Sequence, residues 1–472
     1  MEALLRDCIL TEQGENKFVF SAKDPVRKSE LAVHLSDEPK QISITGRIAR
    51  IRKKSNKMCF ILLRDEDVSL QVLFMASETV TRDYIKDSVA KIPAESVVKI
   101  TGIVVQSPVN IDSATLSKCE MKGETIEVIS QCADAVPIQV YQPDAGLDAR
   151  LNNRCLDLRT IRNQLIFQVQ THIVQKINTY LTHKKFNQIF TPKIMAGVSE
   201  SGSEVFKLDY FGQQASLAQS PQLFKQMAIN SGFGGVFEIG PVFRAEKSDG
   251  SRHLTQYTSV DMEMQIKYNY HEVTTALYEM LCSIFNLKED DRLLELVNDW
   301  KKYNPEYQML QLSDKPIVIS YKDCVTMLTE SEYGCERPED INHQDEFNLG
   351  KLIKKKYETD IFIIDEYPED IRPFYSYVNE DGTTRSYDFV MRGCEILSGA
   401  QRINDYETLL KRAETKMGDI SSISSYLDSF KYGSPPHGGG AFGLERLIAR
   451  YLNVDNVRET TLFPRDPSRL VP

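Results

Sequence analysis

The sequence lacks the patterns that would place the chain in a membrane or in an oxidising compartment. No uncharged apolar run approaches the ~20 residues that a membrane helix needs. The N-terminus, MEALLRDCILTEQGENK, has no basic segment followed by an apolar one, so we expect neither secretion nor membrane insertion. The nine cysteines form no CxxC pair and no zinc spacing, which is typical of reduced thiols in a cytoplasmic protein.

The sequence also lacks the common phosphate-loop patterns. The glycine run at 438–440 is followed by no Gly-Lys-Ser/Thr, and it forms no GxGxxG in a βαβ unit. A formal net charge of −10 argues against a general nucleic-acid binder. Residues 47–64 are a local exception, because they contain seven basic side chains and no acidic one. By itself such a run is more often a solvated face than a binding surface.

Short β-type segments dominate between residues 40 and 132. Apolar and polar residues alternate in 42–48 and 68–74, and VVKITGIVV (97–105) is rich in β-branched residues. About 90 residues of short strands fit a five-stranded OB barrel, a fold that often binds oligonucleotides. Composition alone leaves an SH3-like or other small barrel open.

The rest of the chain predicts one large α+β domain. Ile161, Leu165, Val169, Ile173 and Ile177 form an apolar stripe at i+4 spacing, typical of an amphipathic helix. Beyond it, β-rich blocks alternate with helical ones, as in an α+β domain with a largely antiparallel sheet. The β-rich blocks are 206–265 and 359–404, and the helical blocks are 271–287, 344–356, 406–416 and 442–452. The predicted organisation is a short arm over 1–35, a barrel over 36–132, a linker over 133–150 and an α+β domain over 151–472.

Three separated blocks combine residue types that bind phosphate. The first is FTPK (190–193), after the long helix. The second is GPVFRAE (240–246) with RHLTQYTSVDME (252–263), two predicted strands joined by a charged loop. The third is GGGAFGLER (438–446). Each alone has an ordinary explanation, such as cross-strand ion pairs or a plain turn, but the three in this order leave little room for coincidence.

With these blocks the sequence resembles the class II aminoacyl-tRNA synthetases, within them the aspartate/asparagine/lysine subgroup, and most of all the archaeal and eukaryotic aspartyl type. FEIGPVFRAE (237–246), LSGAQR (397–402) and PPHGGGAFGLER (435–446) carry the resemblance, which runs from about residue 40 to the end. It implies an antiparallel-sheet catalytic domain with an N-terminal all-β OB-fold barrel. The implied reaction forms aspartyl-adenylate and pyrophosphate from L-aspartate and ATP, then transfers aspartate to the 3′-terminal adenosine of tRNA-Asp.

The resemblance implies a set of ATP ligands. Arg244 would grip the α-phosphate, Arg446 would cover one adenine face, and these two are the expected catalytic residues. Tyr257 stands where the family usually has Phe and would stack on the other face. The glycines before Arg446 would let the ligand approach the backbone closely. The full expected ATP-binding set is Arg244, Glu246, His253, Leu254, Tyr257, Glu395, Gly443 and Arg446.

Asp388 and Glu395 match the family's magnesium ligands. Mg²⁺ needs hard oxygen ligands and usually takes only one or two carboxylates. A carboxylate pair at this spacing is more often structural, and the matched context favours the metal. Three residues depart from the family pattern: Ser201 replaces Gly, Gln256 replaces Glu, and Cys394 replaces a Glu.

Charge must separate aspartate from asparagine, because the two are nearly isosteric. Lys225 and Arg402 match the family's readers of the side-chain carboxylate, and a desolvated cation pair would penalise an amide. Asparaginyl relatives typically have a non-basic residue at position 225. Asp261 suits the α-ammonium group. The full expected aspartate-binding set is Ser199, Glu200, Gln222, Lys225, Asp261, Ser398 and Arg402.

In the barrel, Arg52, Phe60 and Gln71 match anticodon contacts, with tRNA-Asp as the expected partner. Without the resemblance Phe60 reads as a core residue of its strand. The resemblance also implies a homodimer, with the helix at 161–185 and Pro192 in the interface, although the helix stripe could instead pack within one subunit.

Three other functions fit parts of the sequence. An asparaginyl-tRNA synthetase is disfavoured by Lys225. An asparagine-forming amidoligase is disfavoured by the predicted barrel, which such enzymes typically lack. A catalytically dead paralogue is disfavoured because the assigned phosphate and metal ligands are all present, namely Arg244, Glu246, Asp388, Glu395 and Arg446.

Overall fold

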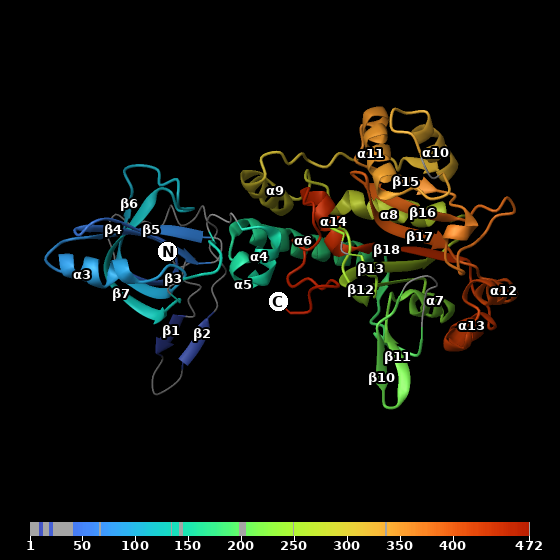
Figure 1. Cartoon of the computed structure of the whole chain (residues 1–472), viewed down its shortest axis with the longest axis horizontal. Helices are drawn as coiled ribbons and strands as arrows, with labels where there is room; N and C mark the ends of the chain where they lie inside the picture. Colours follow the sequence, from blue (N-terminus) through green and yellow to red (C-terminus); the bar gives the residue numbers. More distant parts are fainter. Residues whose placement is uncertain are drawn as a thin grey trace. The chain divides into compact units, whose positions relative to one another are not determined.

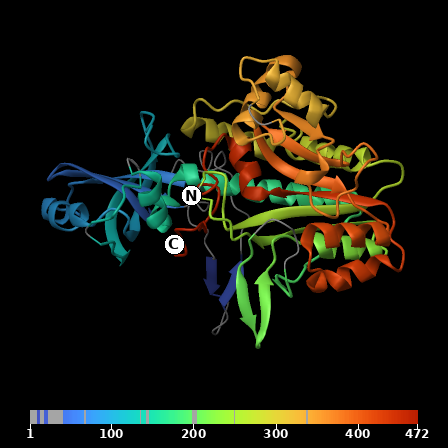
Figure 2. The same cartoon turned by 45° about the vertical axis from the view of Figure 1, so that its right-hand side comes forward.

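The chain forms two compact units, Met1–Ile161 and Arg162–Pro472 (Figures 1 and 2). The computed structural model describes residues 9–12, 18–21, 41–65, 68–133, 135–140, 145–197, 204–248, 250–335 and 338–471. In the predicted arm, β1 (Ile9–Glu12) pairs antiparallel with β2 (Phe18–Ser21). Over the described ranges, no helix is both long enough and apolar enough to span a membrane.

The first unit is built on a closed five-stranded barrel in the order β3-β4-β5-β7-β6. Strands β5 and β7 pair in parallel, and β3 closes the barrel antiparallel to β6. The strands are β3 (Gln41–Ser55), β4 (Met58–Asp65), β5 (Val68–Met75), β6 (Val97–Gln106) and β7 (Cys119–Ser130), with helix α3 (Arg82–Asp87) between β5 and β6. This architecture confirms the predicted all-β OB barrel. Two short helices, α4 (Leu147–Asn152) and α5 (Arg154–Asp157), end the unit.

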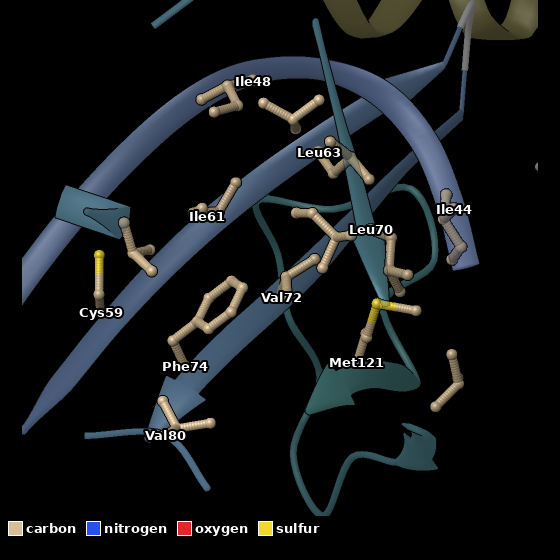
Figure 3. Close-up of a cluster of buried hydrophobic side chains, with 14 of the residues drawn as sticks. Ile44, Ile48, Cys59, Ile61, Leu63, Leu70, Val72, Phe74, Val80 and Met121 are labelled. Atoms are coloured by element: carbon tan, nitrogen blue, oxygen red, sulfur yellow. The ribbon is translucent and has the colours of Figure 1, made fainter. Parts of the chain in front are cut away.

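The barrel core follows the two-residue period of its strands. Side chains of alternate residues on β4 and β5 point inward, where they meet Ile44 and Ile48 of β3 and Met121 of β7 (Figure 3). The inward residues of β4 and β5 are Cys59, Ile61, Leu63, Leu70, Val72 and Phe74. The intervening residues, Phe60 and Gln71 among them, therefore belong to the outer face.

The second unit contains an eight-stranded sheet in the order β14-β15-β16-β17-β18-β13-β12-β8. The strands from β15 to β12 are antiparallel, and β14 and β8 pair in parallel with their neighbours at the two edges. The bounds are β8 (Asn187–Gln188), β12 (Gly235–Phe243), β13 (Gln256–Gln265), β14 (Val318–Ser320), β15 (Ile361–Asp365), β16 (Ser386–Met391), β17 (Cys394–Gln401) and β18 (His437–Gly443). A separate small sheet joins β10 (Lys207–Tyr210), β11 (Gln213–Leu217) and β9 (Ile194–Met195). The predicted α+β class with an antiparallel sheet is confirmed.

Helices surround this sheet, and α10 and α11 lie side by side against its β15–β16 region (Figure 1). The helices of the unit are α6 (Ile161–His183), α7 (Gln222–Asn230), α8 (His271–Ile284), α9 (Asp291–Tyr303), α10 (Tyr321–Thr329), α11 (His343–Tyr357), α12 (Tyr406–Met417), α13 (Ser424–Phe430) and α14 (Leu444–Leu452). The four predicted helical blocks match α8, α11, α12 and α14. Helix α7 lies inside a block predicted to be β-rich.

The long helix α6 buries its predicted apolar stripe within the single chain. Leu165, Val169, Ile173 and Ile177 are each at most 4% exposed. The stripe therefore packs within this subunit, which was the alternative that the sequence left open.

The glycine run lies inside β18, with β17 on one side and β13 on the other. A Cβ atom on Gly439 would overlap the carbonyl oxygen of Met262 and the carboxylate of Glu263. Gly438 would likewise place a Cβ 2.9 Å from the carbonyl oxygen of Ala400. The expectation that these glycines admit a ligand is therefore wrong for 438–440, since they make room for neighbouring strands and for Glu263.

Candidate active site

A pocket of about 380 Å³ opens in the second unit and gathers most of the predicted site. The β12–β13 hairpin, β17, β18 and the start of α14 all contribute to its wall. The pocket is lined by the complete predicted ATP set, Arg244, Glu246, His253, Leu254, Tyr257, Glu395, Gly443 and Arg446. Four residues of the aspartate set also line it, Gln222, Asp261, Ser398 and Arg402. Ser199 and Glu200, with the departure at Ser201, lie outside the described residues.

The β12–β13 hairpin brings the guanidinium of Arg244 and the ring of Tyr257 together, where β12 ends and β13 begins. Arg244 follows β12 directly, and its backbone N–H donates to the carbonyl of Thr255 (2.9 Å), which continues the strand pairing. Its side chain lies 3.8 Å from the carboxylate of Glu246 and 5.8 Å from the centre of the Tyr257 ring. A cation and an aromatic face suited to a nucleotide therefore share one strand end.

Arg446 ties three parts of the pocket wall together. It lies in the first turn of α14, and its Nη1 donates to the carbonyl of Glu395 at 3.0 Å. Its Nη2 donates to the carbonyl of Arg252 at 3.3 Å. Burial alone would lower the pKa of Arg446, but the nearby Glu395 carboxylate raises it, so the guanidinium stays charged. Burial and then Arg446 lower the pKa of His253, which favours the neutral imidazole.

The two predicted metal ligands lie on neighbouring strands, as the sequence suggested. Asp388 is on β16 and Glu395 on β17, joined by a two-residue turn in which Arg392 and Gly393 both have positive φ (50° and 68°). Arg372 Nη2 donates to Asp388 Oδ2 at 2.7 Å, while Asp388 Oδ1 is buried with no hydrogen-bond partner among the described residues. Desolvation in the pocket and the neighbouring Asp388 raise the pKa of Glu395 to about 7. The negative charges of Asp388 and Glu395 repel each other, and a bound divalent cation would reduce this repulsion.

Four charged side chains form a compact network beside the pocket. Lys225 Nζ lies 3.1 Å from Asp261 Oδ1 and 3.4 Å from Glu263 Oε2. Arg402 holds Glu263 by two hydrogen bonds, from Nε (2.9 Å) and from Nη2 (3.1 Å). Burial would raise the pKa of Glu263, but Arg402 and then Lys225 hold it below the ordinary value.

This network corrects the expected cation pair. The sequence predicted two desolvated cations that only a bound carboxylate would satisfy. Within the chain itself, Glu263 and Asp261 balance Lys225 and Arg402, two charges against two. Lys225 itself is buried behind the pocket wall, whereas Arg402 and Asp261 line it. A ligand carboxylate must therefore compete with Glu263 for the cations.

The structure adds site residues that the sequence did not assign. The sequence did contain an indication of Glu263. It lies two residues after Asp261 on the same strand, so the two side chains are on the same face. No pattern in the sequence indicated that segment 371–376 belongs to the site, yet Arg372, Tyr375 and Ser376 line the pocket from a loop. Arg402 lies over the Tyr375 ring at 5.2 Å. Arg372 Nη1 also donates to Ser398 Oγ at 3.1 Å, which joins the metal ligands to the aspartate set.

The barrel places its three candidate anticodon residues on adjacent strands. Arg52 on β3 pairs in register with Phe60 on β4, and its guanidinium lies 5.1 Å from the ring centre. Phe60 is half-buried on the outer face, so the interpretation of it as a core residue is wrong. Gln71 on β5 donates to Glu120 on β7 at 2.5 Å, and Glu120 was not predicted.

Comparison with known proteins agrees with both units. The profile of a family described as tRNA synthetases class II (D, K and N) matches residues 146–467, and that of an OB-fold nucleic acid binding domain matches 42–129. The cytoplasmic aspartate–tRNA ligase of Caenorhabditis elegans is 37% identical, over 93% of this chain and 86% of that protein. The Homo sapiens protein of the same name is 38% identical, over 95% and 91%. A solved aspartyl tRNA synthetase from Entamoeba histolytica is 37% identical with a TM-score of 0.82, covering 92% and 90%.

The chain therefore belongs to the class II tRNA synthetases of the D, K and N group. Within that group, the two curated relatives named above, which the chain covers over most of their length, are aspartate–tRNA ligases.

Proposed function

We propose that the chain is an aspartate–tRNA ligase, which activates L-aspartate with ATP and transfers it to tRNA-Asp. One observation carries the proposal: a single pocket is lined by the whole predicted nucleotide set and by Arg402 and Asp261, with Lys225 directly behind them. The relatives named above are cytoplasmic by name, and the same compartment is proposed here.

The first step needs positioning and charge neutralisation, not a base. The α-carboxylate of aspartate is already a nucleophile when it attacks the α-phosphate of ATP, and pyrophosphate leaves. Arg244 stabilises the charge that develops on the α-phosphate, and Arg446 covers the adenine and reaches the γ-phosphate. Arg244 lies over Tyr257, so ATP would insert its base beside this ring as the guanidinium turns to the phosphate.

Magnesium fits two donors at the pocket wall, Glu395, which lines the pocket, and Asp388, which lies on the neighbouring strand β16 outside the lining. Asp388 Oδ1 is buried with no hydrogen-bond partner among the described residues, and the adjacent Glu395 has a raised pKa, so both gain from a hard cation. The metal would neutralise phosphate charge when it is bound.

Aspartate is selected by charge in an already balanced network. The Arg402 hydrogen bonds use Nε and Nη2, so we assign Nη1 to the side-chain carboxylate of the substrate. Asp261 would take the α-ammonium group, which releases Lys225 to share the new carboxylate. An asparagine amide brings no charge to offset that release. Gln222, which donates no hydrogen bond from its buried Nε2 to any described residue, completes the subsite.

ATP–pyrophosphate exchange without tRNA tests the proposal. We expect exchange with aspartate and none with asparagine or lysine, and loss of exchange when EDTA removes the metal. Exchange with asparagine alone would make the chain an asparaginyl enzyme. No exchange with any of the three would contradict adenylate formation altogether.

The barrel is proposed to read the anticodon through Phe60. Stacking on an exposed aromatic is worth ~1–3 kcal/mol per base. Phe60→Ala is therefore expected to lower kcat/KM for tRNA roughly tenfold or more while pyrophosphate exchange stays unchanged. Val109→Ala, which trims another exposed apolar side chain of the same unit, is the control. Equal loss of both activities in Phe60→Ala would contradict an anticodon role.

A homodimer is also proposed. Phe190, two residues before Pro192, is 80% exposed in the single chain, so its large apolar side chain is available for a contact between subunits. A light-scattering mass near 53.9 kDa at micromolar concentration would contradict the dimer.

A further inference from the structure

Arg252 lines the pocket and donates to the carbonyl of Gly393 in the turn before β17, but the assignments above give it no role. Cys394 begins β17, is buried, and stands where the family usually has a glutamate. The side chains of Arg446, Arg252 and Arg450 all act electrostatically on its thiol.

The carboxylate that pairs with Arg252 comes from a different element, α11. Glu346 Oε2 accepts a hydrogen bond from Arg252 Nη1 at 3.3 Å and another from the backbone N–H of Glu395 at 3.5 Å. The side chains of Glu346 and Arg252 are only 12% and 19% exposed. Over the part of the chain that the structure describes, Arg252 has no other ion pair.

Two glycines bring α11 this close to the sheet. Gly393 lies in the β16–β17 turn with a φ of 68°, and a Cβ on it would lie 2.7 Å from the Cα of Phe347. A Cβ on Gly350 would lie 2.7 Å from the Cα of Gly393. The helix therefore rests on the turn backbone, and Glu346, in its first turn, reaches the start of β17.

From Glu346 the contacts continue to the nucleotide pocket. Arg252 lines the pocket, and its carbonyl oxygen accepts the hydrogen bond from Arg446 Nη2. Arg446 also lines the pocket and donates to the carbonyl of Glu395. Holding Arg252 in place thus holds one of the two backbone carbonyls to which Arg446 is anchored.

We propose that Glu346 is a positioning residue of the ATP site, which fixes Arg252 and, through its carbonyl, Arg446. It places a carboxylate from α11 against Arg252 and against the backbone N–H of Glu395 on β17. The inference rests on the proposed function and deepens it. It assigns part of the ATP affinity to a helix that lies outside the three sequence blocks with phosphate-binding residue types.

Kinetics of pyrophosphate exchange on the full-length chain test the proposal. Glu346→Gln keeps the shape but removes the charge, and we expect the KM for ATP to rise roughly tenfold, since hydrogen bonds between charged groups are stronger than neutral ones. The KM for aspartate should stay within about twofold. Cys394→Glu, added to Glu346→Gln, should recover most of the lost ATP affinity. Glu295→Gln, the same change in the exposed Arg292–Glu295 pair of α9, is the matched control.

A second variant tests whether Glu346 and Arg252 act through one chain of contacts. Arg252→Gln should raise the KM for ATP in the same way, and adding Glu346→Gln to it should have little further effect, because both changes break one chain of contacts. The proposal fails if Glu346→Gln leaves the KM for ATP unchanged, or if it raises the KM values for ATP and aspartate equally. It also fails if the effect of Glu346→Gln adds fully to that of Arg252→Gln, or if Cys394→Glu restores no ATP affinity to Glu346→Gln. Lack of aspartate-dependent exchange in the unmodified chain would instead contradict the proposed function.

Discussion

Arg244→Gln is expected to slow aspartate-dependent pyrophosphate exchange by about 10²- to 10³-fold in kcat, as removal of a donor aimed at developing charge does. Arg244 leads from β12 into the pocket beside Tyr257, and the proposed reaction concentrates negative charge on the α-phosphate as the carboxylate attacks. The KM for ATP should rise less than kcat falls, because the guanidinium is assigned chiefly to the transition state. Steady-state exchange at saturating aspartate measures both constants.

The stability of the Arg244 variant should change little. The side chain is 35% exposed, and its ion pair with Glu246 is long at 3.8 Å, so thermal unfolding should match the unmodified chain closely. Arg244→Lys keeps the charge but loses the planar fork, and it should recover only part of the rate. Arg292→Gln on the exposed face of α9 is the control. An unchanged kcat in Arg244→Gln would remove Arg244 from the catalytic step.

The parts of the site that the sequence predicted are those held by local chain geometry. Arg244 and Tyr257 meet because a hairpin returns along itself, and the register of β12 with β13 follows from two alternating strands. Asp388 and Glu395 approach each other because a two-residue turn separates their strands. These relations depend on neighbours in sequence, so motif spacing could indicate them.

The parts that the sequence missed depend on side chains brought together from distant strands. Glu263 looks like an ordinary strand residue until Arg402, 139 positions later, closes over it. Arg372 comes from a loop without periodicity, and Glu346 from a helix whose distance from β17 is set by two glycines. The glycine run was misinterpreted for the same reason, since its crowding comes from β13 and β17 and not from its own turn.

Lys225→Met is expected to show two separable effects, because Lys225 lies in a buried network and is also assigned to substrate. Removing one cation leaves Asp261 and Glu263 with only Arg402, and breaking a buried ion pair in this way typically costs about 3–5 kcal/mol in the free energy of unfolding. The kcat/KM for aspartate should fall roughly 10³-fold or more, because a carboxylate then enters a site short of positive charge. Denaturant unfolding and pyrophosphate exchange measure the two effects.

The double variant Lys225→Met with Glu263→Gln separates these effects. It leaves one cation, Arg402, and one carboxylate, Asp261, so the net charge of the network returns to zero and part of the lost unfolding free energy should return. Aspartate activation should remain low, because the second cation for the substrate carboxylate is still missing. If activity returns together with stability, then Lys225 serves only to balance Glu263, and selection of aspartate over asparagine does not depend on the lysine itself. The charge of the whole network, and not the lysine by itself, would then distinguish this site from that of an asparaginyl enzyme.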